Sequence, residues 1–156
     1  LIWNFILRLN GTMGYVGTTS MEPIPIFERY YVGGIFSVRG FQRNSLSPTI
    51  PAAAQTDPSA SLVSFPIGGN KQLIFNAEIE IPIYRPMGIV AVLFFDAGNA
   101  FSEEESLDLL DLRTSVGFGF RWWSPMGPLR FEWGFPLDPL KGEEPMVFEF
   151  TIGSAF

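Results

Sequence analysis

The sequence predicts an all-β fold, an antiparallel transmembrane β-barrel to which this chain contributes about six strands. Apolar residues alternate with other residues along several segments, which is the pattern of strands that have one apolar face. The 156 residues are 47% hydrophobic and 17% charged, whereas globular domains are charged at roughly 25%. The apolar runs are nevertheless short, as in residues 88–95, and fall well below the ~20 residues of a membrane helix. A membrane-spanning chain of this kind must therefore cross with strands.

Six segments show the alternation, and nearly all of them have one strongly apolar face. They are Leu1–Asn10, Gln72–Ile83, Val90–Ala97, Ser115–Trp122, Leu129–Phe135 and Met146–Gly153. The opposite face carries Gly, Asn and isolated charges of both signs, unlike the Lys-rich and Thr-rich face of a sheet in water. Large aromatics fill the apolar face, which suits contact with lipid around a wet interior. From the pattern alone, a soluble barrel or sandwich with an apolar core remains the alternative.

The links between these segments alternate between long and short. Residues 11–70, 99–112 and 136–145 form long links, whereas residues 84–87 and the SPMG turn at 124–127 are short. Outer-membrane barrels have this asymmetry, with short periplasmic turns and longer outer loops. The second long link contains Ser102-Glu103-Glu104-Glu105, which matches a capping box and predicts a helix start. We expect its acidic run to be solvated rather than catalytic.

The composition excludes several functions. A net charge of −6 argues against nucleic acid as a partner, because no basic patch is available for phosphates. The chain has no cysteine and no histidine, so we expect neither a metal site nor a cofactor. A P-loop pattern for ATP is also lacking. The chain starts at Leu1 rather than Met and has too few strands to close a membrane barrel, so we interpret it as part of a larger one.

Most of the chain resembles the C-terminal part of the transmembrane barrel in the BamA–TamA superfamily (the bacterial surface antigen family), and the BamA branch in particular. The resemblance rests on YYVGGIFSVRGFQRNSLSP at 30–48, GGN at 68–70, FFDAGNAF at 94–101, DLRTSVGFGFRWWSPMGPLRFEWGFPL at 111–137 and FEFTIGSAF at 148–156. Each motif alone is modest, but their order and spacing together are specific. TamA and the two-partner-secretion pores share the barrel and a VRG-type loop.

The resemblance implies an architecture, a location and a role. Residues 1–156 would be the C-terminal portion of a 16-stranded barrel in the bacterial outer membrane, with a lumen loop at about 12–69 and a C-terminal strand signal at 148–156. The barrel would be the core of a machinery that assembles and inserts other β-barrel proteins, without being an enzyme. Its partners would be nascent outer-membrane proteins, accessory assembly lipoproteins and outer-membrane lipid. The chain itself would need the rest of the barrel, or self-association through its two edge strands.

The family also indicates site residues, which we carry over by motif. The lumen-loop motif is Val38-Arg39-Gly40-Phe41, and its partners in the barrel wall are Phe94 and Asp96. A buried guanidinium needs a carboxylate, and alternation puts Asp96 on the same face as Phe94, the lumen face. Gly40 is expected to adopt a backbone angle closed to other residues. The lateral seam and C-terminal signal are assigned to Phe148, Phe150, Gly153 and Phe156.

Two other functions compete with assembly. A related protein-translocation pore, of the TamA or two-partner-secretion type, would have the same barrel and would differ in its plug helix and in the number of POTRA modules. An outer-membrane enzyme could use Glu78 and Glu80, which share one strand face ~7 Å apart. Neither a histidine nor a Ser-centred motif accompanies these carboxylates, so we interpret them as hydrated groups in the lumen.

Overall fold

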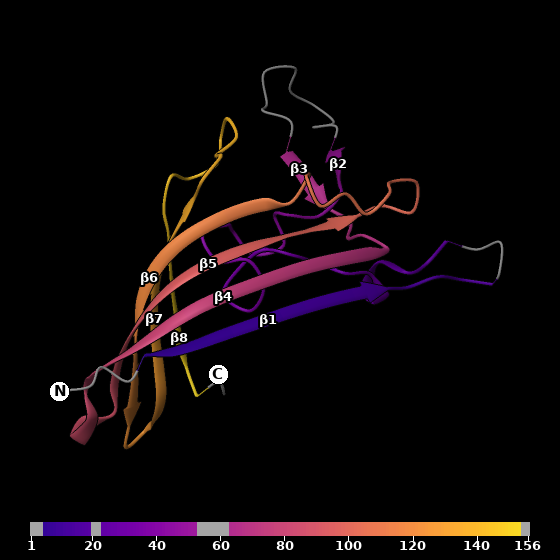
Figure 1. The fold of residues 1–156 in the computed structure, drawn as a ribbon. Helices are drawn as coiled ribbons and strands as arrows, with labels where there is room; N and C mark the ends of the chain where they lie inside the picture. The colour runs from indigo at the N-terminus through magenta and orange to yellow at the C-terminus, as the bar shows by residue number, and fades with distance from the viewer. Residues whose placement is uncertain (1–4, 20–22, 53–62, 154–156) are drawn as a thin grey trace.

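The computed structural model describes residues 5–19, 23–52 and 63–153, and its main feature is one curved, six-stranded antiparallel sheet (Figure 1). In spatial order its strands are β1 (Ile6–Tyr15), β4 (Lys71–Tyr84), β5 (Ile89–Phe101), β6 (Arg113–Ser124), β7 (Gly127–Pro136) and β8 (Val147–Ile152). A separate hairpin pairs β2 (Thr49–Ala52) with β3 (Val63–Pro66), and two 3-10 turns, η1 (Ile26–Glu28) and η2 (Arg85–Met87), complete the elements. The predicted all-β antiparallel fold is confirmed. Within the described residues, no helix is long and apolar enough to cross a membrane.

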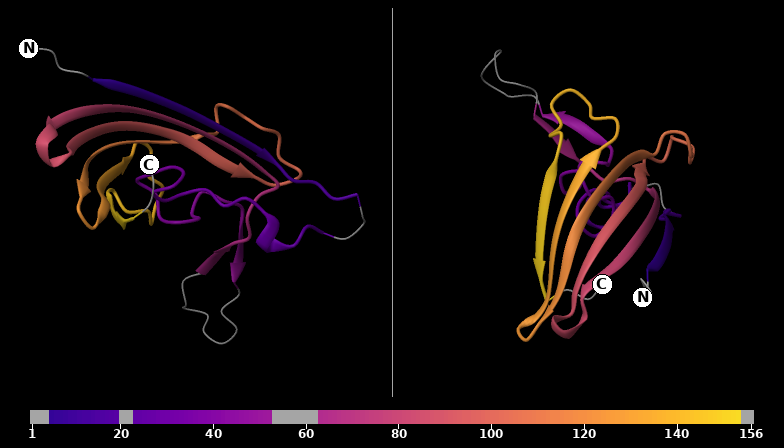
Figure 2. Two further views of the ribbon diagram at one scale, coloured as in Figure 1. Left: turned by 90° about the horizontal axis from the view of Figure 1, so that it is seen from below. Right: turned by 60° about the vertical axis from the view of Figure 1, so that its left-hand side comes forward.

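The links alternate between the two ends of the sheet. The turn at η2 and the β6–β7 turn lie at one end, while the longer links 102–112 and 137–146 lie at the other (Figure 2, right). The longest link, residues 16–70, is the segment that the sequence predicted as a lumen loop at about 12–69, and we keep the name lumen loop for it. Its segment around residues 30–48 lies on the concave side of the sheet, whereas the β2–β3 hairpin extends away from the sheet (Figure 2, left).

The first strand differs from its prediction. It was expected at 1–10, but the described strand begins at Ile6 and continues to Tyr15, which pairs with Lys71 of β4. Residues 1–4 lie outside the described part of the chain. Gly11 interrupts the apolar face, which resumes at Met13 and Tyr15, and the pairing continues through these residues. At Gly14 the missing side chain leaves room for the ring of Tyr30, because a Cβ there would lie 2.7 Å from Tyr30 Cζ.

The predicted helix start at Ser102 is wrong. The link 102–112, all of it described, contains bends and turns but no helix. Half of the capping box does form, since the Ser102 N–H donates to the Glu105 carboxylate at 2.7 Å. However, Lys71 Nζ donates to the carbonyl oxygens of Glu103 and Glu105 at 2.9 and 2.6 Å. These are carbonyls that a helix would need for its own hydrogen bonds. The acidic side chains of this link are exposed, as expected.

The two faces of the sheet have opposite chemistry. The convex face carries exposed large apolar side chains from every strand, among them Leu9, Phe75, Leu93, Phe95, Phe118, Phe120, Phe135 and Phe150. Rings on β6, β7 and β8 form a continuous band, with Phe118 stacked on Trp133 at 5.4 Å and Trp133 lying 5.0 Å from Phe148. Leu129, expected to contact lipid, is only 9% exposed, although its register between Trp122 and Ile152 keeps it on this face. The concave face carries the buried charged residues described below.

The opposite chemistry of the faces can be checked by single-cysteine labelling of the full-length protein in lipid vesicles. Cysteines at Leu93 and Phe118 should react with a lipid-soluble maleimide, because both side chains are exposed on the convex face. Cysteines at Thr12 and Gln72, partly exposed on the concave face, should react with a water-soluble reagent instead. Preferential lipid-phase labelling of Thr12 and Gln72 would reverse the assignment of the faces.

Candidate functional site

The lumen loop forms hydrogen bonds within itself that do not involve the sheet. Gly33 and Gly34 have φ values of 112° and 101°, which reverse the chain direction just before the motif. The Leu46 N–H donates to the Val32 carbonyl at 2.9 Å, and the Val32 N–H donates to Ser47 Oγ at 3.0 Å. These bonds satisfy backbone groups that would otherwise be buried without partners. The segment can therefore lie inside a protein without becoming a strand.

An apolar cluster attaches this segment to the sheet. Val32, Val38, Phe41 and Leu46 from the loop pack with Ile74 of β4 and Ala100 of β5, and all six are buried. The Ala100 N–H also donates to the Leu46 carbonyl at 3.0 Å. Burying four apolar side chains in this way stabilises the docked loop by about 1.5–3 kcal/mol for each large one. Docking therefore has an apolar component that is independent of the charges beside it.

Arg39 is bound to Asp96 through its side chain and its backbone. Arg39 Nε lies 2.6 Å from Asp96 Oδ2 and Nη2 lies 2.7 Å from Oδ1, so the pair is bidentate. The backbone N–H of Arg39 donates to the same Oδ2 at 3.0 Å. Both side chains are almost fully buried, at 3% and 0% exposed. A short, charge-assisted fork of this kind is a strong and directional contact.

Further groups complete the surroundings of Arg39. Nη1 donates to Glu78 of β4 and lies 3.3 Å from Glu132 of β7, while the guanidinium sits 3.8 Å from the centre of the Phe94 ring. Burial alone lowers the pKa of Arg39, but the hydrogen bond and charge of Asp96, together with Glu132 and Glu78, raise it above its ordinary value. Arg39 is therefore charged at every pH at which the fold exists.

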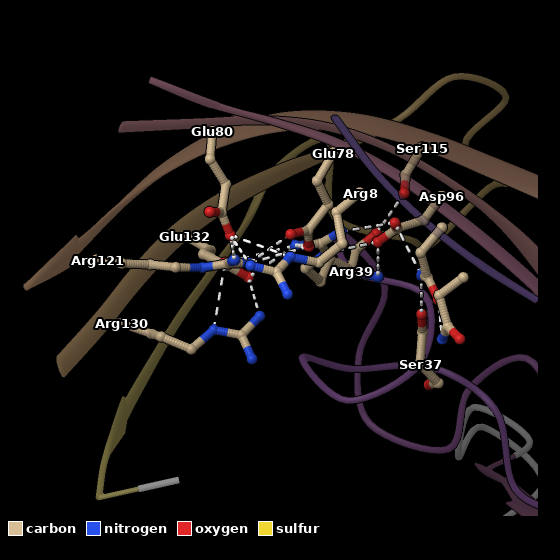
Figure 3. Close-up of polar contacts among 12 residues, drawn as sticks. Arg8, Ser37, Arg39, Glu78, Glu80, Asp96, Ser115, Arg121, Arg130 and Glu132 are labelled. Carbon is tan, nitrogen blue, oxygen red and sulfur yellow. Dashed lines mark hydrogen bonds and ion pairs between the residues drawn. The ribbon is translucent and has the colours of Figure 1, made fainter. Parts of the chain in front are cut away.

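The Arg39 pair belongs to a larger group of charges, which we call the inner ion cluster. Its arginines are Arg8, Arg39, Arg121 and Arg130, and its carboxylates are Glu78, Glu80, Asp96 and Glu132 (Figure 3). The four positive charges equal the four negative ones, so the cluster is neutral as a whole. Arg39 lies centrally between the group around Arg121 and Arg130 and the group around Asp96. It is also the one member that comes from the loop, since the other seven lie on β1 and β4 to β7.

Three of the four carboxylates, Glu78, Glu80 and Glu132, are each shared by more than one arginine, whereas Asp96 pairs with Arg39 alone. Arg121 lies 2.8 Å from Glu80 and 3.1 Å from Glu132, and Arg130 lies 2.8 Å from Glu132. Removing water from an unpaired charge costs several kcal/mol, and deleting one partner of a buried pair costs about 3–5 kcal/mol. The buried members of the cluster therefore depend on one another, and the part on the sheet lacks one positive charge until Arg39 arrives.

The structure corrects our reading of Glu78 and Glu80. We interpreted them as hydrated, but both are only 8% exposed, and they pair with Arg39, Arg121 and Arg8. The physical reason is that arginines reach them from three different elements: Arg8 from the neighbouring strand β1, Arg121 from β6 and Arg39 from the loop. Alternation indicated that Arg121, Arg130 and Glu132 point inward, but it could not show that they meet Arg39. Among the described residues, no group of His, Cys, Asp or Glu is arranged to hold a metal ion.

Glycines allow the loop to approach the sheet closely. Gly40 has a φ of 85°, and a Cβ there would lie 2.9 Å from the carbonyl carbon of Gly134 on β7. A Cβ on Gly134 would in turn lie 2.4 Å from both N and Cα of Gly40. The two backbones are thus in direct contact. Gly117 likewise leaves the space that the Phe94 ring occupies, with a Cβ position only 2.2 Å from Phe94 Cζ.

Phe41 makes a second contact, on the other side of the motif. Its ring lies 5.0 Å from the guanidinium of Arg113, which begins β6. Arg113 in turn binds Glu143 in the link 137–146, with Nη2 to Oε2 at 2.6 Å. Burial raises the pKa of Glu143, but the hydrogen bonds from Arg113 and from the Leu140 N–H outweigh it and hold the pKa below its ordinary value.

The residues assigned to the seam lie at the edge of the sheet. Phe148 and Phe150 of β8 point to the convex face and are half exposed, and Phe150 lies 4.8 Å from Phe131. Gly153 follows β8 with a φ of 75°. Phe156 lies outside the described residues. β8 and β1 are the two ends of the strand order, so neither is paired on its outer side within this sheet.

A curved antiparallel sheet with an apolar convex face and a loop bound to its charged concave face defines a portion of an outer-membrane β-barrel wall. The chain belongs to the Omp85 superfamily, whose domain matches residues 2–156. It is similar to the outer membrane protein assembly factor BamA of Nitratidesulfovibrio vulgaris, with 36% identity over 98% of this chain and 18% of the relative. The protein of the same name from Neisseria meningitidis serogroup B is 29% identical, over 97% of this chain and 22% of the relative.

A solved structure shows the same fold. The crystal structure of BamA from Haemophilus ducreyi lacking POTRA domains 1–3 superimposes with a TM-score of 0.78 and 25% identity, covering 97% of this chain and 32% of that one. The resemblance inferred from the sequence is thus confirmed, as is the outer-membrane location. The chain spans about a fifth of the length of the two curated relatives.

The close approach of the two glycines predicts the effect of adding one methyl group. Gly134→Ala in the full-length protein should lower the free energy of unfolding by about 1–3 kcal/mol, because the new Cβ would meet backbone rather than a movable side chain. Urea unfolding followed by tryptophan fluorescence measures this. The matched control is Gly11→Ala, also in a strand of the sheet, whose Cβ would make an ordinary contact at 3.6 Å with Phe75. Equal unfolding midpoints would contradict the close approach.

The Arg113–Glu143 pair predicts a pH dependence of the link 137–146. Because the pKa of Glu143 is lowered by folding, its contribution is complete above the ordinary glutamate pKa of about 4.3 and is lost as the pH falls through the lowered value. The carboxyl carbon of Glu143, followed by NMR in glutamate-labelled full-length protein, should titrate below that pH. Arg113→Gln should raise the midpoint. A midpoint that the substitution leaves unchanged would show that Arg113 does not lower it.

Proposed function

We propose that this chain is the C-terminal wall of a barrel that assembles and inserts other β-barrel proteins into the bacterial outer membrane, with the lumen loop bound to the wall through Arg39. The observation that carries the proposal is the buried, bidentate Arg39–Asp96 contact in a chain whose relatives are named outer membrane protein assembly factors. Nascent outer-membrane proteins, accessory lipoproteins and outer-membrane lipid would be its partners. The names of the relatives describe an assembly factor and not an enzyme, which supports a non-enzymatic role.

The loop would keep the wall in one shape. Arg39 contacts Glu78 on β4, Asp96 on β5 and Glu132 on β7, and its carbonyl oxygen accepts a hydrogen bond from Ser115 on β6. One residue is thus joined to four consecutive strands. A sheet in lipid that must change shape at one place needs the rest to stay fixed. The Val38-Arg39-Gly40-Phe41 motif would supply this rigidity.

The place that changes shape would be the seam at β8. This strand has six residues, whereas β4 has fourteen, so it forms fewer backbone hydrogen bonds with its neighbour. Gly153, directly after it, cannot continue a regular strand at its positive φ. An incoming strand could pair with the exposed edge by β-augmentation, while Phe148 and Phe150 remain against lipid. The edges of β1 and β8 would otherwise need the rest of the barrel or a second copy of the chain.

The related translocation pore is the second candidate. It would use the same wall and the same VRG-type loop, so the ion cluster does not separate the two functions. The names of the matched relatives favour assembly. The distinguishing features are a plug helix and the number of POTRA modules, which belong to the portion of such proteins that precedes the barrel wall.

A double-mutant cycle in the full-length protein tests the role of the Arg39–Asp96 pair. Arg39→Ala and Asp96→Ala should each slow the insertion of a barrel substrate into lipid vesicles, because each leaves a buried charge without its partner. The double mutant should lose less than the sum of the two, since it leaves neither partner alone. Fully additive losses would remove the pairing from the proposal.

Arg8→Ala is the matched control for this cycle. Arg8 belongs to the same cluster and pairs with Glu80 at 2.9 Å, but its side chain is 52% exposed. Water can replace it, so its removal should change the insertion rate much less than Arg39→Ala does. A loss as large as that of Arg39→Ala would mean that any charge change in the cluster impairs assembly, without a special role for the loop.

A further inference from the structure

The aromatic residue of the motif contacts a different part of the wall from the arginine two positions before it. Phe41 is 2% exposed, and one face of its ring is covered by the Arg113 guanidinium at 5.0 Å. Arg113 takes no part in the inner ion cluster. It stands at the first position of β6, near the end of the sheet where the long links lie. The motif therefore makes two separate contacts, one with the inner cluster and one with this end.

Arg113 connects Phe41 to the link that leads into the last strand. Its Nη1 and Nη2 bind the two carboxylate oxygens of Glu143 at 3.1 and 2.6 Å. Nη2 also donates to the Asp138 carbonyl at 2.8 Å, so the guanidinium holds the link at two points. The Glu143 carboxylate in turn accepts the Leu140 N–H at 2.7 Å. The link 137–146 is thereby folded around one side chain.

The link lies directly against the motif. Between them is a cavity of about 70 Å³, lined on one side by Gly40, Phe41 and Gln42 and on the other by Glu143, Glu144 and Val147. Gln42 Nε2 donates to Glu144 Oε1 at 3.4 Å across this contact. Val147 is the first residue of β8. A displacement of the link would therefore displace the beginning of the strand that forms the edge of the sheet.

We propose that Phe41, Arg113 and Glu143 form a latch that positions β8 according to whether the lumen loop is docked. With the loop docked, the Phe41 ring covers the guanidinium, and the guanidinium holds the link 137–146 and the start of β8. When the loop leaves, Arg113 loses the ring and the link loses its support. This inference rests on the proposed function, since it assigns the Phe41 ring the control of the seam strand in addition to its part in the apolar cluster that docks the loop.

An ordinary surface ion pair would behave differently. Arg113 and Glu143 are 18% and 25% exposed and are joined by two hydrogen bonds, so the pair by itself could hold the link without any contribution from the loop. It would also be indifferent to the residue at position 41. The latch instead requires the aromatic face, because a cation is attracted to the ring itself. Replacing Phe41 by an aliphatic residue therefore distinguishes the two.

The test uses the full-length protein with nitroxide labels on paired cysteines. One label replaces Arg43 in the loop, and the other replaces either Lys141 in the link or Met146 just before β8; all three side chains are exposed. Phe41→Leu keeps an apolar side chain but removes the ring, and Arg113→Gln removes the cation. Phe36→Leu is the matched control, because Phe36 lies in the same loop but is 74% exposed. Electron–electron double resonance reports both distances, and substrate insertion into vesicles is followed in parallel.

The latch predicts that Phe41→Leu and Arg113→Gln each broaden both distance distributions, and that the double variant is no broader than the single ones. Insertion should slow several-fold in each, while Phe36→Leu should match the unsubstituted protein. Unchanged distances in Phe41→Leu, or additive broadening in the double variant, would overturn the latch. So would broadened distances with an unchanged insertion rate, because β8 would then not be positioned for function. If the unsubstituted protein inserts no substrate, the proposed function fails, while the distances still decide whether the latch exists.

Discussion

The structure depends on one buried positive charge that does not belong to the sheet. Arg39 enters the concave face from a loop and meets Asp96, Glu78 and Glu132, carboxylates supplied by three different strands. Those strands carry more negative than positive charge at this place, so the positive charge of the loop is needed to balance the charges of the wall. Its closed backbone and its apolar cluster with Ile74 and Ala100 make the position of that charge reproducible.

The two-residue period of the strands gives the two faces of the sheet opposite chemistry. On the convex face, rings such as Phe118 and Trp133 lie side by side and present a continuous apolar surface. On the concave face, a large side chain on one strand lies beside a glycine on the neighbouring strand. The Phe94 ring, for example, occupies the space above Gly117. Without that space the ring could not lie under the guanidinium of Arg39. Lipid contact outside and charge pairing inside are thus consequences of one strand pattern.

The period of two could be read from the sequence, and it predicted the antiparallel strands and the facing of Phe94 and Asp96, whereas the choice of a membrane barrel over a soluble sandwich also used the family resemblance. What it could not supply was the register between strands, which decides that Glu78 and Glu132 also reach Arg39. It placed the end of β1 too early, because Gly11 interrupts the apolar face before Met13 and Tyr15 resume it, and backbone pairing does not require a side chain at Gly11. The capping box at Ser102 was a separate local signal, and it failed because Lys71, distant in the sequence, binds the carbonyl oxygens of Glu103 and Glu105. The link between Phe41 and Glu143 through Arg113 joins three segments, and no local pattern contains it.

The contact between Gly40 and Gly134 has an evolutionary consequence. In the inner ion cluster, the loss of one charged side chain can in principle be offset by the loss of its partner on another strand, because neither partner is then left buried alone. The two glycines allow no such exchange. A side chain on either one would meet the backbone of the other. The partner glycine has no side chain whose loss could make room for it. No second substitution can therefore compensate for a change at either glycine. The rest of the loop can vary only while both positions remain glycine.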